Sequence, residues 1–104
     1  MTDKELLELA AKAAGYTDIK YENGWWLEVR YGLTEAFWNG EDYWNPLEDN
    51  DDAFRLAVKL TVLNGYRVEI PNVDDGEDQY AATRRAIVQT AAEIGKIMGE
   101  QNEV

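Results

Sequence analysis

The side chains of this chain that could do chemistry are mostly carboxylates, gathered in the clusters Glu41-Asp42, Glu48–Asp52 and Asp74–Asp78. Carboxylate oxygens bind Ca²⁺ or Mg²⁺, but a calcium loop needs ligands at alternating positions and a glycine at the sixth. The second cluster runs into Ala53 and Phe54, where a polar ligand and that glycine should stand. The third cluster is too short and its glycine comes too early. The spacing therefore predicts no metal site.

Paired carboxylates beside aromatic rings could also hydrolyse a glycan, one carboxyl acting as acid and the other as base or nucleophile. Four tryptophans could serve as sugar platforms: Trp25, Trp26, Trp38 and Trp44. Such a pair is defined by its separation across a cleft, which a sequence does not provide. A small module that binds or hydrolyses a ligand or glycan is therefore the alternative hypothesis for function.

Two residue types that support much of enzyme chemistry are missing. The chain has no cysteine and no histidine. Their absence excludes disulfides, thiolate metal ligands, cysteine nucleophiles and the histidine base of a serine triad. Because no catalytic motif stands out either, the sequence predicts a non-enzymatic protein that uses no cofactor.

The charge balance indicates the kind of partner that the chain would bind. Its 104 residues include 21 acidic and 10 basic side chains, a formal net charge of −11. That charge repels phosphate backbones and attracts basic surfaces. We therefore expect a protein partner with a basic surface and no direct contact with nucleic acid. No apolar run is long enough to span a bilayer, and the acidic N-terminus is unlike a secretion signal, so we expect no membrane contact and a cytoplasmic location.

Helical periodicity predicts three helices, because apolar residues recur at spacings of three and four in three segments. Asn50 or Asp51 is the expected cap of the middle helix, and Arg55 is the expected i,i+4 partner of Asp51. This helix is apolar on most sides, so we expect it to be the most buried. Its expected core residues are Phe54, Val58 and Leu60. The predicted helices are 3–14, 51–64 and 78–98.

Alternating and β-branched stretches predict the strands. Asn23-Gly24 is typical of a two-residue hairpin turn, and Pro71 ends the last stretch. The predicted strands are 18–22, 25–31, 34–40 and 66–71. The order α-β-β-(β)-α-β-α predicts an α+β fold, with a small antiparallel or mixed sheet of three to four strands packed against the helices. We expect one domain over 1–104 with a frayed tail at 99–104.

Tryptophan offers a second way to recognise a partner, since it is enriched at interface hot spots. In a regular strand, adjacent side chains point to opposite faces. Trp25 would then face the core, while Trp26 would share its face with Glu28 and Arg30. The strand model therefore predicts Trp26 as the aromatic anchor of a partner surface.

The loop before the last helix supplies the charged part of that predicted surface. Arg84 and Arg85 follow this loop and are expected to pair with Glu77, Asp78 or the other acidic clusters. The acidic residues assigned to the surface are Asp74, Asp75, Glu77 and Asp78.

Two stretches, "WNPLEDNDDAFRLAVKL" over 44–60 and "YAATRRAIVQTAAEIGK" over 80–96, resemble a family of small phage and prophage proteins, the phage ABA-sandwich domain. The resemblance is carried by a Trp-Asn-Pro-Leu turn, an Arg-Leu-Ala-Val-Lys-Leu helix and an Ala-Thr-Arg-Arg-Ala-Ile helix. It implies a helix/sheet/helix sandwich, a phage or prophage origin and a bacterial host cell. It brings no catalytic residues and implies structural roles for Trp44, Asn45, Pro46, Asp51 and Arg55.

The expected function is that of a small acidic accessory protein that binds a host or phage protein through an acidic surface. Interference with a nucleic-acid enzyme or a defence complex is one form that such binding could take. Both a monomer and a homodimer are compatible with the sequence.

Overall fold

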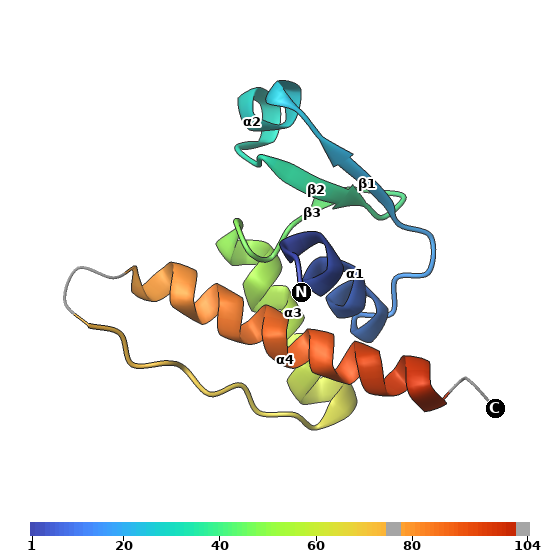
Figure 1. Cartoon of the computed structure of the whole chain (residues 1–104), viewed down its shortest axis with the longest axis vertical. Coiled ribbons are helices and arrows are strands. Elements are labelled where there is room, and N and C mark those ends of the chain that lie inside the picture. The colour runs from blue at the N-terminus through green and yellow to red at the C-terminus, as the bar shows by residue number, and fades with distance from the viewer. Residues whose placement is uncertain (75–77, 102–104) are drawn as a thin grey trace.

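The computed structural model describes residues 1–74 and 78–101, in which four helices and a three-stranded antiparallel sheet form an α+β fold (Figure 1). The predicted fold class is therefore confirmed. The elements are α1 (Asp3–Ala13), β1 (Lys20–Asn23), α2 (Trp25–Tyr31), β2 (Glu35–Trp38), β3 (Tyr43–Trp44), α3 (Asn50–Asn64) and α4 (Gln79–Gln101).

Five of the predicted elements appear close to their expected places. The expected helices 3–14, 51–64 and 78–98 are α1, α3 and α4. The expected strand 18–22 overlaps β1, and the expected strand 34–40 contains β2. Helix α4 continues to Gln101, so it includes the first three residues of the predicted tail. Residues 102–104 lie outside the described part of the chain.

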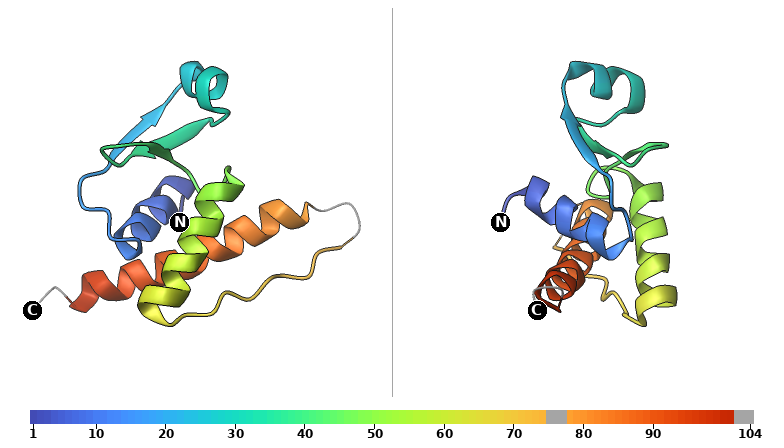
Figure 2. Two further views of the ribbon diagram at one scale, coloured as in Figure 1. Left: turned by 180° about the vertical axis from the view of Figure 1, so that it is seen from behind. Right: turned by 90° about the vertical axis from the view of Figure 1, so that its right-hand side faces the viewer.

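The sheet separates two apolar cores, because side chains alternate between its faces. Tyr21, Phe37 and Trp44 are aligned across the three strands and pack into the main core with α1, α3 and α4. Ala36 lies on the opposite face and packs with Leu27 of α2 in a second, smaller core. Figure 2 shows α2 at one end of the molecule, beyond the sheet from the other three helices. The layers are thus those of a helix/sheet/helix sandwich.

Helices α1 and α4 approach each other closely where glycine removes a side chain. A Cβ atom at Gly95 of α4 would overlap the backbone carbonyl oxygen of Leu9 in α1. Near the start of both helices, Arg85 and Asp3 form an ion pair of 3.1 Å. The backbone contact at Gly95 therefore sets the spacing of the two helices.

The predicted second strand is wrong, because its residues form the helix α2. Gly24, with a φ of 143°, precedes the helix, and Gly32 ends it in a left-handed conformation. A strand would place Trp25, Leu27 and Val29 on one face. In the helix, Trp25 and Val29 lie one turn apart and are exposed, while Leu27 points to the other side and is buried.

The tight connection between strands occurs at Asn39-Gly40 instead of Asn23-Gly24. The Asn39 side-chain oxygen accepts hydrogen bonds from the backbone N–H groups of Glu41 and Asp42, at 3.0 and 2.9 Å. The backbone N–H of Asn39 donates to the carbonyl of Asp42 at 3.2 Å. These bonds close the turn that joins β2 to β3.

Among the described side chains of α3, those that are buried lie on one face of the helix. The expectation of a helix covered on most sides is therefore wrong. Leu56 and Leu60 are fully buried, as predicted for Leu60. Phe54 and Val58, both predicted in the core, are 69% and 43% exposed. The reason is angular: positions one turn apart share a face, and the face that contains Phe54 and Val58 is turned away from the main core.

The prediction that residues 66–71 form a strand of the sheet is also wrong. The 15 residues of α3 carry the chain roughly 22 Å along the helix axis, away from β3. After α3 the chain runs back as an extended segment beside α4 (Figure 1). No sheet edge lies within its reach, so its strand-forming sequence has no partner strand in the described chain.

We predict that Gly95→Ala destabilises the fold, whereas Gly99→Ala, one turn further along α4, does not. The new methyl group at 95 meets backbone that cannot rotate away, and overpacking of this kind costs about 1–3 kcal/mol. At 99 the neighbour is the flexible Lys12 side chain, 3.4 Å away. There, helix propensity favours alanine by up to about 1 kcal/mol. Urea unfolding followed by circular dichroism measures both, and equal stabilities of the two variants would contradict the close helix contact.

Candidate functional site

The turn between β3 and α3 is organised around the side chain of Asn45, which is fully buried. Its amide nitrogen donates to the carbonyl oxygen of Glu35 at 2.7 Å and to a Glu48 carboxylate oxygen at 3.0 Å. Its amide oxygen accepts from the backbone N–H of Leu47 at 2.9 Å. The backbone N–H of Asn45 donates to Asp52 at 3.0 Å. Strand β2, the turn and helix α3 are thereby joined at one residue.

The acid cluster Glu48–Asp52 is largely used inside the fold. Glu48 also accepts from the hydroxyl of Thr34 at 2.6 Å and from its backbone N–H at 3.0 Å. Asp49 is the N-cap of α3 and accepts from the N–H of Asp51 at 3.3 Å. The prediction of Asn50 or Asp51 as the cap is therefore wrong, because the cap lies one or two residues earlier in the chain. Over residues 1–74 and 78–101, no three metal-binding side chains come together.

Arg84 fastens this turn to α4 in a way that the sequence did not suggest. Its Nε donates to the carbonyl oxygen of Leu47 at 2.8 Å, and its Nη1 donates to the side-chain oxygen of Asn50 at 2.7 Å. Arg85 pairs with Asp3. Among the described residues, Arg84 thus binds the turn that contains the Glu48–Asp52 cluster and Arg85 binds α1, whereas neither arginine pairs with Asp78.

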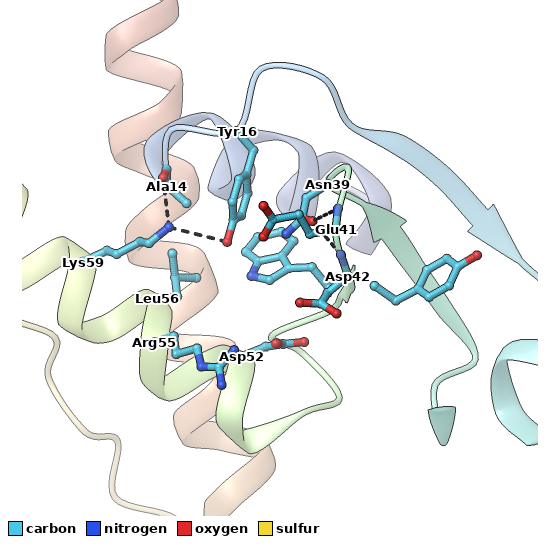
Figure 3. A pocket seen from close by; sticks show the side chains of 11 residues that line it. Ala14, Tyr16, Asn39, Glu41, Asp42, Asp52, Arg55, Leu56 and Lys59 are labelled. Atoms are coloured by element: carbon cyan, nitrogen blue, oxygen red, sulfur yellow. Dashed lines mark hydrogen bonds between the residues drawn. The ribbon is translucent and has the colours of Figure 1, made fainter. Parts of the chain in front are cut away.

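A cleft of about 420 Å³ opens between the end of α1, the β2–β3 turn and α3 (Figure 3). Lys59 closes one side: its Nζ lies 3.4 Å from the carbonyl oxygen of Ala14, 3.5 Å from the hydroxyl of Tyr16 and 4.5 Å from the centre of that ring. Trp44 packs edge-on against Tyr16 and is buried. The charged side chains that line the cleft are Glu41, Asp42, Asp52, Arg55 and Lys59.

A second hollow of about 360 Å³ lies between α2 and the start of α3, and we call it the acidic hollow. It shares Asp42, Asp52 and Arg55 with the cleft. In the described chain Arg55 forms no ion pair with Asp51, so the expected pairing is wrong. The acidic hollow is lined by Tyr31, Leu33, Asp42, Tyr43, Asp49, Asp51, Asp52 and Arg55.

Asp52 is the carboxyl whose proton affinity the fold changes most clearly. The pKa of Asp52 is raised to about 6, chiefly by burial and also by the nearby carboxylate of Asp49, although the hydrogen bond from the Asn45 N–H acts to lower it. The ionised form is costly because the carboxylate has lost much of its water. The cleft can therefore take up a proton near pH 6, and its charges of both signs suit a small polar ligand.

The aromatic side chains of α2 and β3 form a packed cluster, and Trp26 belongs to it. The Trp26 ring lies 5.3 Å from that of Tyr43 and 6.4 Å from that of Tyr31, centre to centre. Trp38 approaches Tyr43 to 4.9 Å. The hydroxyl of Tyr43 donates to Glu22 at 3.0 Å. Trp26 is thus half-buried, which is less exposed than the strand model implies, and its place in a partner surface stays a prediction.

The exposed tryptophan on this element is Trp25, which is 75% exposed, with Val29 at 72% beside it. The helix places these two residues on one outward face, one turn apart. We call Trp25, Val29 and the exposed Tyr31 the α2 tip. The residue pattern that could have revealed it is the pair of glycines, Gly24 and Gly32, that bracket a segment of helical length.

The acidic loop is less independent of the fold than the sequence indicated. Asp78 caps α4, because its Oδ1 accepts from the backbone N–H groups of Tyr80 and Ala81, at 2.9 and 3.2 Å. Asp74 is exposed. Asp75 and Glu77, the other two residues of the predicted surface, lie outside the described residues.

Comparison of the chain with protein-family models, curated proteins and solved structures gives no match. In residues 1–74 and 78–101, no helix combines the length and the apolar character needed to cross a membrane.

We predict that Asp52 makes the stability of the fold depend on pH between about 4 and 7. Its pKa is 3.8 in the reference state and about 6 when folded, so the folded chain holds this proton more tightly. The contribution of Asp52 to the free energy of unfolding should therefore fall as pH rises through this window. In Asp52→Asn that dependence should be lost, and Asp51→Asn removes the same charge from an exposed neighbour as a control.

The measurement is the free energy of unfolding of the three proteins at unit pH steps, together with the NMR titration of the Asp52 carboxyl carbon. A midpoint near 4 for that carbon would refute the effect of burial.

We predict that Asn45→Ala destabilises the fold by at least about 2 kcal/mol, because it leaves the Glu35 carbonyl and the Leu47 N–H without partners. Each buried polar group left unpaired costs about 1–3 kcal/mol. Asn72→Ala, at an exposed position, should change stability by less than about 0.5 kcal/mol. Thermal and urea unfolding of both variants provide the comparison, and similar values for the two would mean that Asn45 is not the organising residue.

Proposed function

We propose that this chain is a protein-binding accessory protein that contacts its partner with the α2 tip. The observation that carries this proposal is the exposed pair Trp25 and Val29, side by side on one helix face. An indole ring exposed to this degree is costly in water, and tryptophan is the residue most enriched among interface hot spots. A partner that covers both side chains recovers that cost.

The rigidity of the tip supports the same proposal. The helix rests on the aromatic cluster of Trp26, Tyr31, Tyr43 and Trp38, whose rings contact one another at 4.7–6.4 Å. A preorganised surface loses little conformational entropy when it binds. The tip can therefore present Trp25 to an apolar pocket or groove without rearrangement.

The charge around the tip selects the chemistry of the partner. The acidic hollow begins at Tyr31 and contains the carboxylates of Asp42, Asp49, Asp51 and Asp52 against the single cation Arg55. A lysine or arginine of the partner would be attracted to it while Trp25 is buried beside it. The partner that fits is a protein with an apolar pocket next to basic side chains.

The resemblance to phage and prophage proteins adds a setting to this proposal. In that setting the partner is a protein of the bacterial host or of the phage. Proteins that handle nucleic acids carry basic surfaces, and a chain with a net charge of −11 competes for them electrostatically. Interference with a nucleic-acid enzyme or a defence complex is therefore part of the proposal.

A second candidate function is binding of a small polar ligand in the cleft, which the raised pKa of Asp52 favours. Arg55 and Lys59 would bind an anionic group, and Glu41 and Asp42 a cationic one. Trp44 is buried behind Tyr16, so its ring offers no platform to a sugar. Amino acids and short oligosaccharides are suitable probes, and NMR shifts confined to Tyr16, Lys59 and their neighbours would identify this function.

We predict that Trp25→Ala weakens partner binding at least tenfold, because a hot-spot truncation typically costs 2 kcal/mol or more, about thirtyfold. The experiment is capture of partners from bacterial lysate by the wild-type chain, followed by measurement of Kd for the captured protein with each variant. Ile97→Ala, at a half-exposed position on α4, is the control and should leave Kd unchanged.

Salt and charge variants complete this test. Binding should weaken from 0.1 to 1 M salt, as the Debye length falls from about 10 to about 3 Å. Asp42→Asn with Asp51→Asn, both exposed, should mainly slow association. A partner whose affinity is indifferent to Trp25, to salt and to these two carboxylates would refute the proposed surface.

A further inference from the structure

The segment between α3 and α4 contains a strand-like sequence without a strand partner. Residues 66–70 read Tyr-Arg-Val-Glu-Ile, an alternating β-branched pattern. Within the described chain, the backbone bonds of this stretch are limited to Tyr66 N–H, which donates to Leu60 at the end of α3. Val68 packs against the main core and holds the segment in place. Among the described residues, no backbone–backbone hydrogen bond uses the N–H or C=O groups of 67–70, so these groups are available to another strand.

The five residues are complementary to themselves in the antiparallel direction. When two copies align about a two-fold axis at Val68, Tyr66 of each copy lies opposite Ile70 of the other. Arg67 of each lies opposite Glu69 of the other. Aromatic with β-branched and opposite-charge pairs are the cross-strand pairs that stabilise sheets. A two-fold axis forms each of these pairs twice.

The same pattern disfavours other registers. A shift of two residues in one direction places Arg67 opposite Arg67, and a shift of two in the other places Glu69 opposite Glu69. Like charges directly opposite each other are destabilising. A shift of one residue moves the side chains to the wrong faces. The strand also has defined ends, since Gly65 has a φ of 69° and Pro71 offers no N–H.

An exposed apolar surface adjoins this segment. Two neighbouring hollows between α3 and α4, of about 240 and 260 Å³, share Ala57, Thr83 and Ile87. Their linings are mostly apolar, and the first includes Val68 and Ile70. Large apolar side chains exposed on these elements are Phe54 (69%), Val58 (43%), Val62 (73%), Ile70 (69%) and Tyr80 (71%).

We propose that this face pairs with the same face of a second copy of the chain, through antiparallel pairing of Tyr66–Ile70 about a two-fold axis. A two-stranded ribbon of this length is marginal by itself. The adjoining apolar surface, buried in the same contact, supplies the remaining stabilisation. The α2 tip lies at the other end of the molecule (Figure 1), so it remains free in the dimer.

The dependence of this dimer on salt is opposite to that of a contact with a basic partner. Each copy carries a net charge of −11, and association brings two such charges together. Salt screens that repulsion, so the dimer becomes tighter as salt rises. The cross-strand ion pairs are weakened by salt, but two exposed pairs contribute little compared with the net repulsion.

The test is sedimentation of the purified chain over a range of concentrations at 0.05 and 0.5 M salt. We expect a monomer–dimer equilibrium that shifts toward dimer at the higher salt. Arg67→Glu and Glu69→Arg each turn both ion pairs into like-charge pairs in direct contact, so at 0.5 M salt, where the net repulsion is screened, each should raise the dimer Kd at least tenfold. Both side chains are exposed, and unfolding curves of the variants confirm that the fold is kept.

Restoration of the pairs separates this contact from any other dimer. The double variant with Arg67→Glu and Glu69→Arg exchanges the charges and should recover the wild-type Kd to within about threefold. A mixture of the two single variants should form a heterodimer more readily than either forms a homodimer, since one chain then has two acids opposite two bases.

Three results would overturn the proposal: a monomer at every concentration and salt, a dimer insensitive to both single changes, or single variants whose mixture does not associate. Trp25→Ala should leave the dimer Kd unchanged. The proposed partner surface and the dimer can therefore fail independently.

Discussion

The buried amide of Asn45 is the contact on which the arrangement of the molecule depends. A primary amide in an apolar interior is tolerated only when its donors and acceptor are satisfied, and Asn45 binds Glu35, Leu47 and Glu48. Those bonds fix the start of α3 against β2, and Arg84 holds the same turn to α4. The direction of α3 follows from this start, so the chain leaves α3 far from the sheet. The extended segment over 66–70, which has no partner strand in the described chain, is a consequence of that departure.

Elements with strong local signals were predictable, and those decided by tertiary contacts were not. Periodic apolar residues and terminal glycines located α1, α3 and α4 within three residues at their ends. The dipeptide Asn-Gly occurs twice, and local chemistry does not distinguish Asn23-Gly24 from Asn39-Gly40. The second becomes the hairpin because the Asn39 side chain binds Glu41 and Asp42. Asn23-Gly24 instead precedes a helix, because Leu27 of that helix packs into the smaller core on the far side of the sheet.

The wrong predictions at the candidate site concern the helix α2, which was expected to be a strand, and the acidic cluster Glu48–Asp52. A strand would cover Trp25 and expose Trp26, whereas the helix exposes Trp25 and half-buries Trp26, because the period changes from 2 to 3.6. Composition presents Glu48–Asp52 as a patch of surface charge, yet Glu48, Asp49 and Asp52 all accept hydrogen bonds within the fold. An acidic residue that caps or cross-links cannot be told from a solvated one by its spacing. The α+β class was predicted correctly, because it depends on the presence of both helices and strands and not on these contacts.

The net charge favours binding at one of the two proposed surfaces and opposes it at the other. At the α2 tip, the carboxylates of the acidic hollow, which begins at Tyr31, add attraction to a basic partner, and salt removes it. At the segment 66–70, the same total charge opposes pairing of two identical copies, and salt relieves the opposition. The local Arg67 and Glu69 pattern does not cancel this repulsion, but it determines which register the two strands adopt. Ionic strength therefore distinguishes the two contacts without any mutation: a complex that tightens with salt is held by the apolar face beside Val68, and one that loosens is held by the carboxylates near Tyr31.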